Sequence, residues 1–343
     1  MGHVKEMLRD LVSHALVGSG TTALGRRLRD RKGTLILYGH RVQGDDEGYL
    51  QGCPPDWFRD QVAYLARHYE VLPLSTLVAC LEERRPPPPR SVVLTLDDGF
   101  RDNVEQALPI LDGLGVRATI FVVTQSLSDG RLPWAQRLGF MFQHTAAASL
   151  QHELLGHEPV ALTAPSSRRG AYDHVKRALA PLPRELRDAH ITALADALEV
   201  EPPLDRMMDW GHARAALASG HEIGAHTYSH ALLAAVPRDE ARREMLRSKA
   251  DLDEQLGIRR ASFCFPGGST NRELCGVARE LGFRSAFLPD PSRRLNRPPD
   301  VDAFSMVRVG IPNAPAHHLE AELEGPFHTL RAWAGRHKRS ARH

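Results

Sequence analysis

Two short segments of the sequence carry side chains that can do chemistry. In the first, Asp97 and Asp98 stand side by side at the end of an apolar run and are followed by Gly99. Adjacent carboxylates at the end of a strand point in different directions, so one can bind a metal ion while the other accepts a proton. The alternative is a simple Asp-Gly turn in which one carboxylate caps the helix that follows.

The second segment places His226 and His230 four residues apart. Imidazoles at this spacing can contact one cation if the backbone between them turns as in a helix. The spacing alone is weak evidence, because 18 histidines among 343 residues would produce about one such pair by chance. The position of the pair supports a metal site more strongly, because the pair also follows a short apolar run. Two histidines and one aspartate, with room for water, form a ligand set of catalytic zinc sites.

Apolar runs and amphipathic stretches predict the elements that must position these side chains. Buried parallel strands are expected at residues 34–38, 91–96, 118–123 and 222–225. Helices are expected at residues 57–67, 102–111, 209–219 and 237–256. Strands that alternate with helices predict an α/β fold with a parallel sheet or barrel. The carboxyl ends of its strands would bring the two segments to one rim.

Residues 125–207 interrupt this alternation. Helical patterns at 136–144 and 171–198, with a loop at 163–170, predict a helical insertion between two core strands. The expected organisation has three parts: an N-terminal helical extension (1–32), a barrel (33–312) that contains the insertion, and a C-terminal helix and basic tail (313–343).

The composition excludes several classes of protein. With 42% apolar and 25% charged residues the chain is globular, and its net charge of +2 predicts no nucleic-acid partner. Widely spaced cysteines fit reduced thiols better than a disulfide framework or a zinc knuckle. They are Cys53, Cys80, Cys264 and Cys275.

The charge pattern of the termini bears on location. Residues 1–32 carry acids and bases throughout and lack a cleavage-site pattern, so a cytoplasmic location is expected. The N-terminal helix is expected to pack on the domain. The alternative is peripheral contact with an anionic membrane on the cytoplasmic face, because five bases and no acid follow Glu324. The sequence does not indicate the oligomeric state.

Together the two motifs resemble those of the polysaccharide deacetylases, carbohydrate esterase family four. The resemblance is strong at residues 98–111, 116–122 and 218–226, and it covers roughly residues 34–125 and 205–312. It implies a distorted (β/α) barrel of about seven parallel strands with a helical insertion. It also implies a hydrolase that removes N-acetyl groups from an amino sugar in a glycan, glycolipid or glycan precursor.

Carried onto this sequence, the family motifs make Asp98, His226 and His230 the ligands of one divalent metal ion, and Asp97 the catalytic base. Zinc is the expected ion, with cobalt, nickel and manganese as alternatives. The expected partner is an N-acetylated sugar or glycan.

The third family motif, at Phe265, Pro266 and Gly267, departs from its usual form, because residues 262–269 contain no arginine and a glycine stands where the family has an aromatic residue. The segment resembles a Phe-x-Tyr-Pro-x-Gly variant and is expected to contact the substrate. Arg308 then either orients Asp97 in place of the missing arginine or lies on the surface beside an edge strand.

Three further positions are less specific. His40 resembles part of a Tyr-His-x-Val element, with an inserted glycine before it, and is either the general acid or a histidine bonded within a loop. Trp134 either lines the sugar site or packs in the interior. His317 and His318 lie near the place of the last family motif but have Ala and Pro neighbours, so they are expected to be loop residues.

Two other functions stay open at this point. The same barrel could hydrolyse a C–N bond of a cyclic amide or imide that is not a sugar. A carbohydrate-binding relative without activity is the second alternative, and the presence of Asp97 together with all three expected ligands argues against it.

Overall fold

The computed structural model describes residues 2–28, 32–44, 49, 51–289 and 295–325. Among these, no helix combines the length and the hydropathy that a membrane span requires. The basic tail predicted after Glu324 falls almost entirely outside the described residues.

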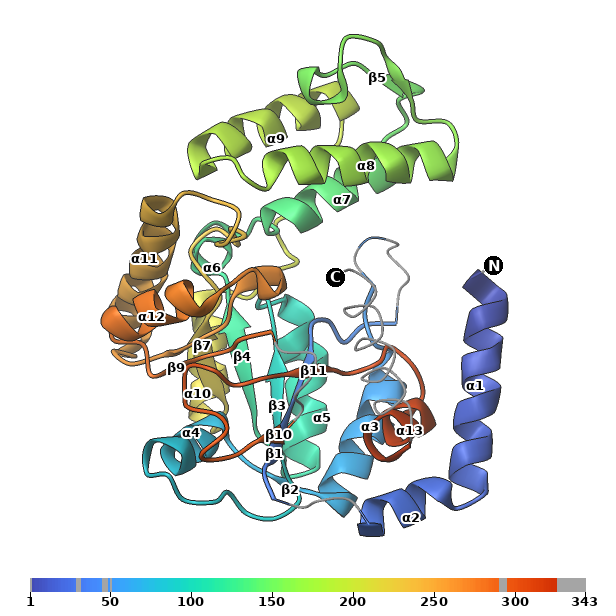
Figure 1. The fold of residues 1–343 in the computed structure, drawn as a ribbon. Coiled ribbons are helices and arrows are strands. Elements are labelled where there is room, and N and C mark those ends of the chain that lie inside the picture. The colour runs from blue at the N-terminus through green and yellow to red at the C-terminus, as the bar shows by residue number, and fades with distance from the viewer. Residues whose placement is uncertain (1, 29–31, 45–48, 50, 290–294, 326–343) are drawn as a thin grey trace, which may run out of the picture.

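A nine-stranded sheet lies at the centre of the protein (Figure 1). Its main path runs β10-β1-β3-β4-β7-β8-β9, with β11 beside β1 and β2 beside β3. All its ladders are parallel except that between β1 and β10. The strands are β1 (Thr34–Gly39), β2 (Glu70–Val71), β3 (Ser91–Leu96), β4 (Ala118–Val122), β7 (Glu222–Ala225), β8 (Ser262–Phe263), β9 (Ser285–Ala286), β10 (Leu295–Asn296) and β11 (Val309–Gly310).

Helices cover the outside of the sheet, and the predicted distorted (β/α) barrel is confirmed. The helices are α3 (Pro55–His68), α4 (Leu74–Glu82), α5 (Leu108–Gly113), α6 (Thr124–Asp129), α10 (Trp210–Ala218), α11 (Arg238–Leu256) and α12 (Arg272–Glu280). The helix predicted at 102–111 instead starts as a π turn, η2 (Asn103–Ala107), before α5. Pro109, the second residue of α5, has no N–H for a regular helical bond, which accounts for the irregular turn.

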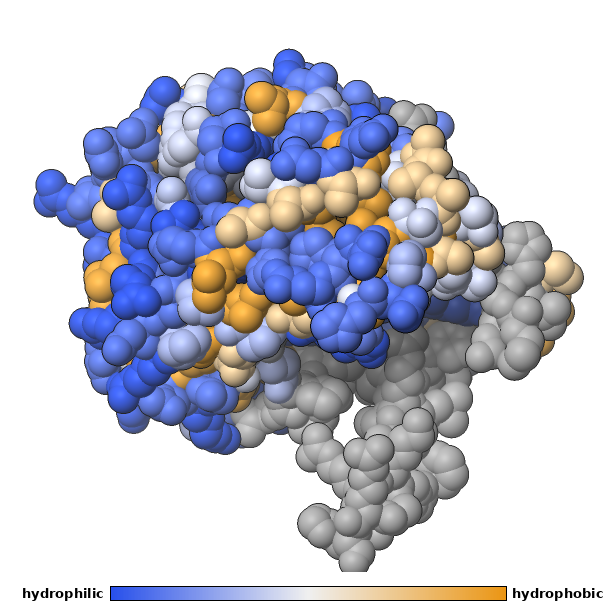
Figure 2. Space-filling model, turned by 90° about the horizontal axis from the view of Figure 1, so that it is seen from above, coloured by the Kyte–Doolittle hydropathy of each residue, from blue (hydrophilic) through white to orange (hydrophobic). Residues whose placement is uncertain are grey.

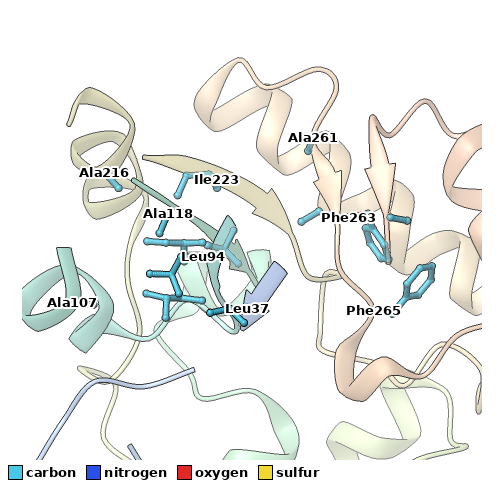
Figure 3. Close-up of a cluster of buried hydrophobic side chains, with 14 of the residues drawn as sticks. Leu37, Leu94, Ala107, Ala118, Ala216, Ile223, Ala261, Phe263 and Phe265 are labelled. Carbon is cyan, nitrogen blue, oxygen red and sulfur yellow. The ribbon is translucent and has the colours of Figure 1, made fainter. Parts of the chain in front are cut away.

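The central strands are buried on both faces, as continuous apolar runs in a parallel sheet require. All six residues of β3 are buried. Figure 3 shows Leu37, Leu94, Ala118 and Ile223 of β1, β3, β4 and β7 gathered together, with Phe263 and Phe265 of the same cluster on the other side of the view. Such packing holds the strand ends rigidly, and these ends carry the candidate site.

The predicted insertion forms three helices, α7 (Trp134–His144), α8 (Pro165–Leu179) and α9 (Arg184–Leu198), and a short hairpin of β5 (Ser149–Leu150) and β6 (Val160–Ala161). It lies above the sheet in Figure 1 and has its own hydrophobic cluster. Its outer face is mostly hydrophilic (Figure 2).

Two expectations about the insertion were wrong. The loop expected at 163–170 is largely helical, because proline suits the first turn of a helix and α8 begins at Pro165. The single helix expected at 171–198 is two helices, since Pro181 and Pro183 cannot continue a helix between them.

The first two helices pack against the last described helix beside the barrel. Helices α1 (Gly2–Gly18) and α2 (Thr21–Leu28) pack with α13 (Ala316–Glu324). His317 and His318 therefore lie in the first turn of a helix, and the expectation that they are loop residues was wrong. Pro315 directly precedes this turn and provides a favourable helix start.

Candidate metal centre and catalytic pocket

The two predicted motifs meet at the carboxyl ends of two parallel strands, β3 and β7. Asp97 and Asp98 follow β3, and His226 follows β7. The backbone of Asp98 (φ +76°) and of His230 (φ +61°) adopts the left-handed conformation, which is unfavourable for side chains with a Cβ. Strain of this kind is retained where the surrounding structure holds it and clusters at functional sites.

Asp98, His226 and His230 present three ligand atoms to a common point. Asp98 Oδ1 lies 3.3 Å from His226 Nε2 and 3.1 Å from His230 Nε2. In a tetrahedral zinc site neighbouring ligand atoms stand about 3.3 Å apart. Asp98 Oδ1 is buried and has no hydrogen-bond partner among the described residues. A buried carboxylate oxygen without a donor, facing two imidazole nitrogens, fits a divalent metal ion.

Hydrogen bonds behind these ligands set their orientation. His226 Nδ1 donates to the carbonyl oxygen of Cys264 at 2.7 Å, which leaves the lone pair of Nε2 directed at the common point. Burial raises the pKa of Asp98, but the imidazoles of His230 and His226 outweigh it and hold this pKa well below the usual range. The carboxylate is therefore ionised, as a metal ligand must be.

The helical insertion supports the same ligands. Gln136 Nε2, on α7, donates to Asp98 Oδ2 at 2.8 Å. Trp134 Nε1 donates to the carbonyl oxygen of His230 at 2.9 Å. The structure thus places Trp134 in the interior, beneath the histidine loop, and not on the wall of the pocket that holds Asp97. Sequence reasoning missed Gln136, because nothing local distinguishes it from other polar helix residues.

Arg308 forms a two-point ion pair with Asp97. Its Nη1 and Nη2 donate to Asp97 Oδ1 and Oδ2 at 2.8 and 2.7 Å. The guanidinium lies over the rings of Tyr38 and Phe287, at 4.6 and 4.8 Å from their centroids. The sequence left two positions open for Arg308, and the structure shows it beside Asp97 and not on the surface.

This ion pair keeps Asp97 ionised. Burial by itself raises the pKa of Asp97, but the charge and hydrogen bonds of Arg308 outweigh it, so the pKa is lowered from 3.8. Cys264 Sγ lies 3.9 Å from Asp97 Oδ2, and burial raises the pKa of this thiol, which stays neutral. Cys264 was predicted only as a reduced cysteine. Cys264 stands between two phenylalanines of the third motif, and this position was the sequence signal that could have predicted its contact with Asp97.

A pocket of about 320 Å³ opens beside Asp97. Phe265 and Gly267 of the third motif line it, and Arg308 contributes to its wall. His40 also lines the pocket, where its side chain is exposed. Pro266 is buried behind the lining residues. The pocket thus combines an ionised carboxylate, an accessible imidazole and an aromatic ring.

The family model described as polysaccharide deacetylase matches residues 84–286, more than half of the chain. The chain therefore belongs to the polysaccharide deacetylase family, as its motifs predicted.

A curated relative and two solved structures complete the comparison. The putative polysaccharide deacetylase YxkH of Bacillus subtilis (strain 168) is 28% identical over 89 residues, which are 26% of this chain and 31% of that protein. The match thus spans less than a third of that relative.

The deacetylase PplD of Streptococcus pyogenes, solved in complex with acetate, has a TM-score of 0.54 at 18% identity, over 85% of this chain and 97% of that one. IcaB from Ammonifex degensii has a TM-score of 0.55 at 19% identity, over 86% and 97%. Likeness at these identities establishes the shared fold.

Proposed function

We propose that the protein is a metal-dependent hydrolase that removes the N-acetyl group from an amino sugar in a glycan, glycolipid or glycan precursor. The observation that carries this proposal is the arrangement of Asp98, His226 and His230 around one point, next to the ionised Asp97 in an open pocket. Membership of the polysaccharide deacetylase family supports it.

The three ligands hold the metal ion and Asp97 acts as the base. When bound, a divalent ion lowers the pKa of water and polarises a carbonyl group. Asp97 accepts a proton from the water that attacks the acetamide carbonyl carbon. Arg308 keeps this carboxylate ionised and fixes its direction through both oxygens. His40, on the pocket wall, donates a proton to the departing amine.

The dimensions and lining of the pocket support a sugar as substrate. A volume of about 320 Å³ is at the lower end of ligand pockets and suits one sugar ring. Phe265 lies at the inner wall of the pocket and is almost fully buried, and Gly267 beside it has no side chain that would narrow the opening. Zinc is the proposed ion, because the ligand set of two imidazoles and one carboxylate is typical of it, and cobalt, nickel and manganese accept the same donors.

Acetate release tests the proposal directly. The purified protein is loaded with zinc and incubated with N-acetylated sugars, free, polymeric and carrier-linked, and acetate is measured. Wild type should release acetate from at least one of them, and Asp97→Asn should release almost none while retaining its zinc. Hydrolysis of cyclic amides alone would favour the other C–N hydrolase reaction. Sugar binding without metal or turnover would favour a non-catalytic relative.

We also propose peripheral contact with an anionic membrane through α1. Met7, Leu8 and Leu11 on this helix are 71%, 60% and 67% exposed, an unusual concentration of apolar side chains at the surface. Co-sedimentation with vesicles that contain anionic lipid should fall when Leu8 and Leu11 are replaced by Ser, and equal sedimentation of both proteins would contradict the proposal. The cytoplasmic location stays a prediction.

A further inference from the structure

A second cluster of potential metal ligands lies between α1 and α13. Asp10 and His14 are one turn apart on α1, and His317 stands at the start of α13. His317 Nε2 lies 2.8 Å from Asp10 Oδ1, and His14 Nδ1 lies 3.6 Å from Asp10 Oδ2. The three ligand atoms are all within 4.8 Å of one another. None of these residues belongs to the catalytic pocket.

The side chains of α1 and α13 direct their ligand atoms at a common point between the two helices. Residues four apart on a helix share a face, so Asp10 and His14 present their side chains together to α13. The imidazoles of His14 and His317 are 3.8 Å apart between ring centroids. His14 Nδ1 lies 3.3 Å from the carbonyl oxygen of Asp10 and 3.6 Å from Asp10 Oδ2, so a bound ion would replace a long hydrogen bond to the backbone, and the second distance is suitable for two ligands of one ion.

A neighbouring histidine holds the carboxylate in position. His318 Nε2 lies 2.9 Å from Asp10 Oδ1, and its Nδ1 lies 3.5 Å from Ser13 Oγ. His318 is 7% exposed, so it is anchored between the two helices. Hydrogen bonds to a ligating carboxylate from the groups around it are a regular feature of metal sites.

The cluster is also accessible. The side chains of Asp10 and His14 are 50% and 63% exposed, whereas that of His317 is 16% exposed. An ion can therefore enter from solvent, and water can complete its coordination. Two imidazoles and one carboxylate suit zinc, nickel or copper, and they do not suit calcium or magnesium, which take oxygen ligands.

We propose that Asp10, His14 and His317 bind a divalent transition-metal ion, with zinc as the principal candidate, and that this ion links α1 to α13. The site exists only when the two helices are docked, so binding stabilises the docked state by mass action. The ion is separate from that of the catalytic centre, and its effect is to secure the N-terminal helix and not to catalyse.

Zinc stoichiometry tests the site. Untagged protein is dialysed against chelator-buffered zinc at micromolar free concentration, and zinc per chain is measured by mass spectrometry of the metal. Wild type should bind one zinc more per chain than His14→Ala and than His317→Ala. His157→Ala, at an exposed histidine of the insertion, should equal wild type. This difference does not depend on whether the catalytic centre is loaded, and equal stoichiometry in all four proteins would overturn the proposal.

Proteolysis tests the link between the helices. Arg9 is an exposed trypsin site within α1, and cleavage there requires local opening of the helix. Free zinc at ten times its dissociation constant should slow this cleavage about tenfold in wild type and not in His14→Ala. Circular dichroism verifies that the variant is folded. Cleavage that is unaffected by zinc in wild type would refute the role of the ion in holding α1.

Discussion

The ion pair between Arg308 and Asp97 makes the most specific prediction, because both charges are buried. The two side chains are 11% and 4% exposed, and they are joined by two hydrogen bonds. Replacing Arg308 by Met removes the charge but keeps much of the apolar volume. It leaves the carboxylate of Asp97 buried without its cation.

The expected loss of stability follows from that arrangement. Removing one partner of a buried ion pair costs about 3–5 kcal/mol. The contact of the guanidinium with the rings of Tyr38 and Phe287 contributes about 1–2 kcal/mol more to the stability of the wild type, and the substitution removes this contribution as well. Methionine recovers part of this second contribution by contact with the same rings. We therefore expect Arg308→Met to lower the free energy of unfolding by about 4–6 kcal/mol, which is the loss of the ion pair plus the part of the ring contact that methionine does not recover.

A double-mutant cycle measures the pair itself. The free energy of unfolding is determined by urea denaturation for wild type, Arg308→Met, Asp97→Asn and the double variant at neutral pH. The double variant buries no charge at this place, so it should be more stable than Arg308→Met. A double variant no more stable than Arg308→Met, or a loss below about 1 kcal/mol in the single one, would refute the reasoning.

The pH dependence provides an independent check of sign. Arg308 lowers the pKa of Asp97 from 3.8, so the stabilisation is present above this value and is lost as the pH falls through the lower pKa of the folded state. The difference in stability between wild type and Arg308→Met should therefore shrink at strongly acidic pH. A difference that stays constant down to the lowest pH at which both fold would contradict the electrostatic origin.

Three further predictions concern the same site. Asp97→Asn should reduce kcat for acetate release by about 10²–10⁴-fold with unchanged zinc content, and activity near that of wild type would exclude Asp97 as the base. Gln136→Ala should weaken zinc binding at the catalytic centre by about 10–100-fold, measured by competition with a chelator in the His14→Ala background; an unchanged affinity would show that the bond to Asp98 does not matter. Gly99→Ala should destabilise the protein by about 1–3 kcal/mol in urea, because Gly99 has φ +77° and a Cβ there would lie 3.1 Å from Val122; full stability would mean that the turn relaxes easily.

Much of the site could be predicted because its chemistry is local in the sequence. Asp97 and Asp98 are adjacent, and His226 and His230 are four residues apart, so each motif is recognisable on its own. The apolar runs before them predicted strands, and parallel strands end at the same edge of a sheet. That rule is sufficient to predict that the two motifs lie together.

Apart from the π turn at the start of the helix predicted at 102–111, the predictions that were wrong lie in the insertion and in the C-terminal segment. There, prolines at helix starts made α8 and the first turn of α13 look like loops. Proline is unfavourable inside a helix and favourable in its first turn, so the same residue is compatible with both interpretations. Only neighbouring packing decides between them.

The sequence by itself determined the family, the class of fold, and the four residues that meet at the candidate metal centre. Tertiary structure alone decided which of the two possible positions Arg308 takes, since its partner lies 211 residues away. It also decided that Gln136 of the insertion supports Asp98, and that His317 of α13 meets Asp10 of α1. Contacts of this kind depend on how separate elements pack, and no periodicity or spacing within one segment of the chain encodes them.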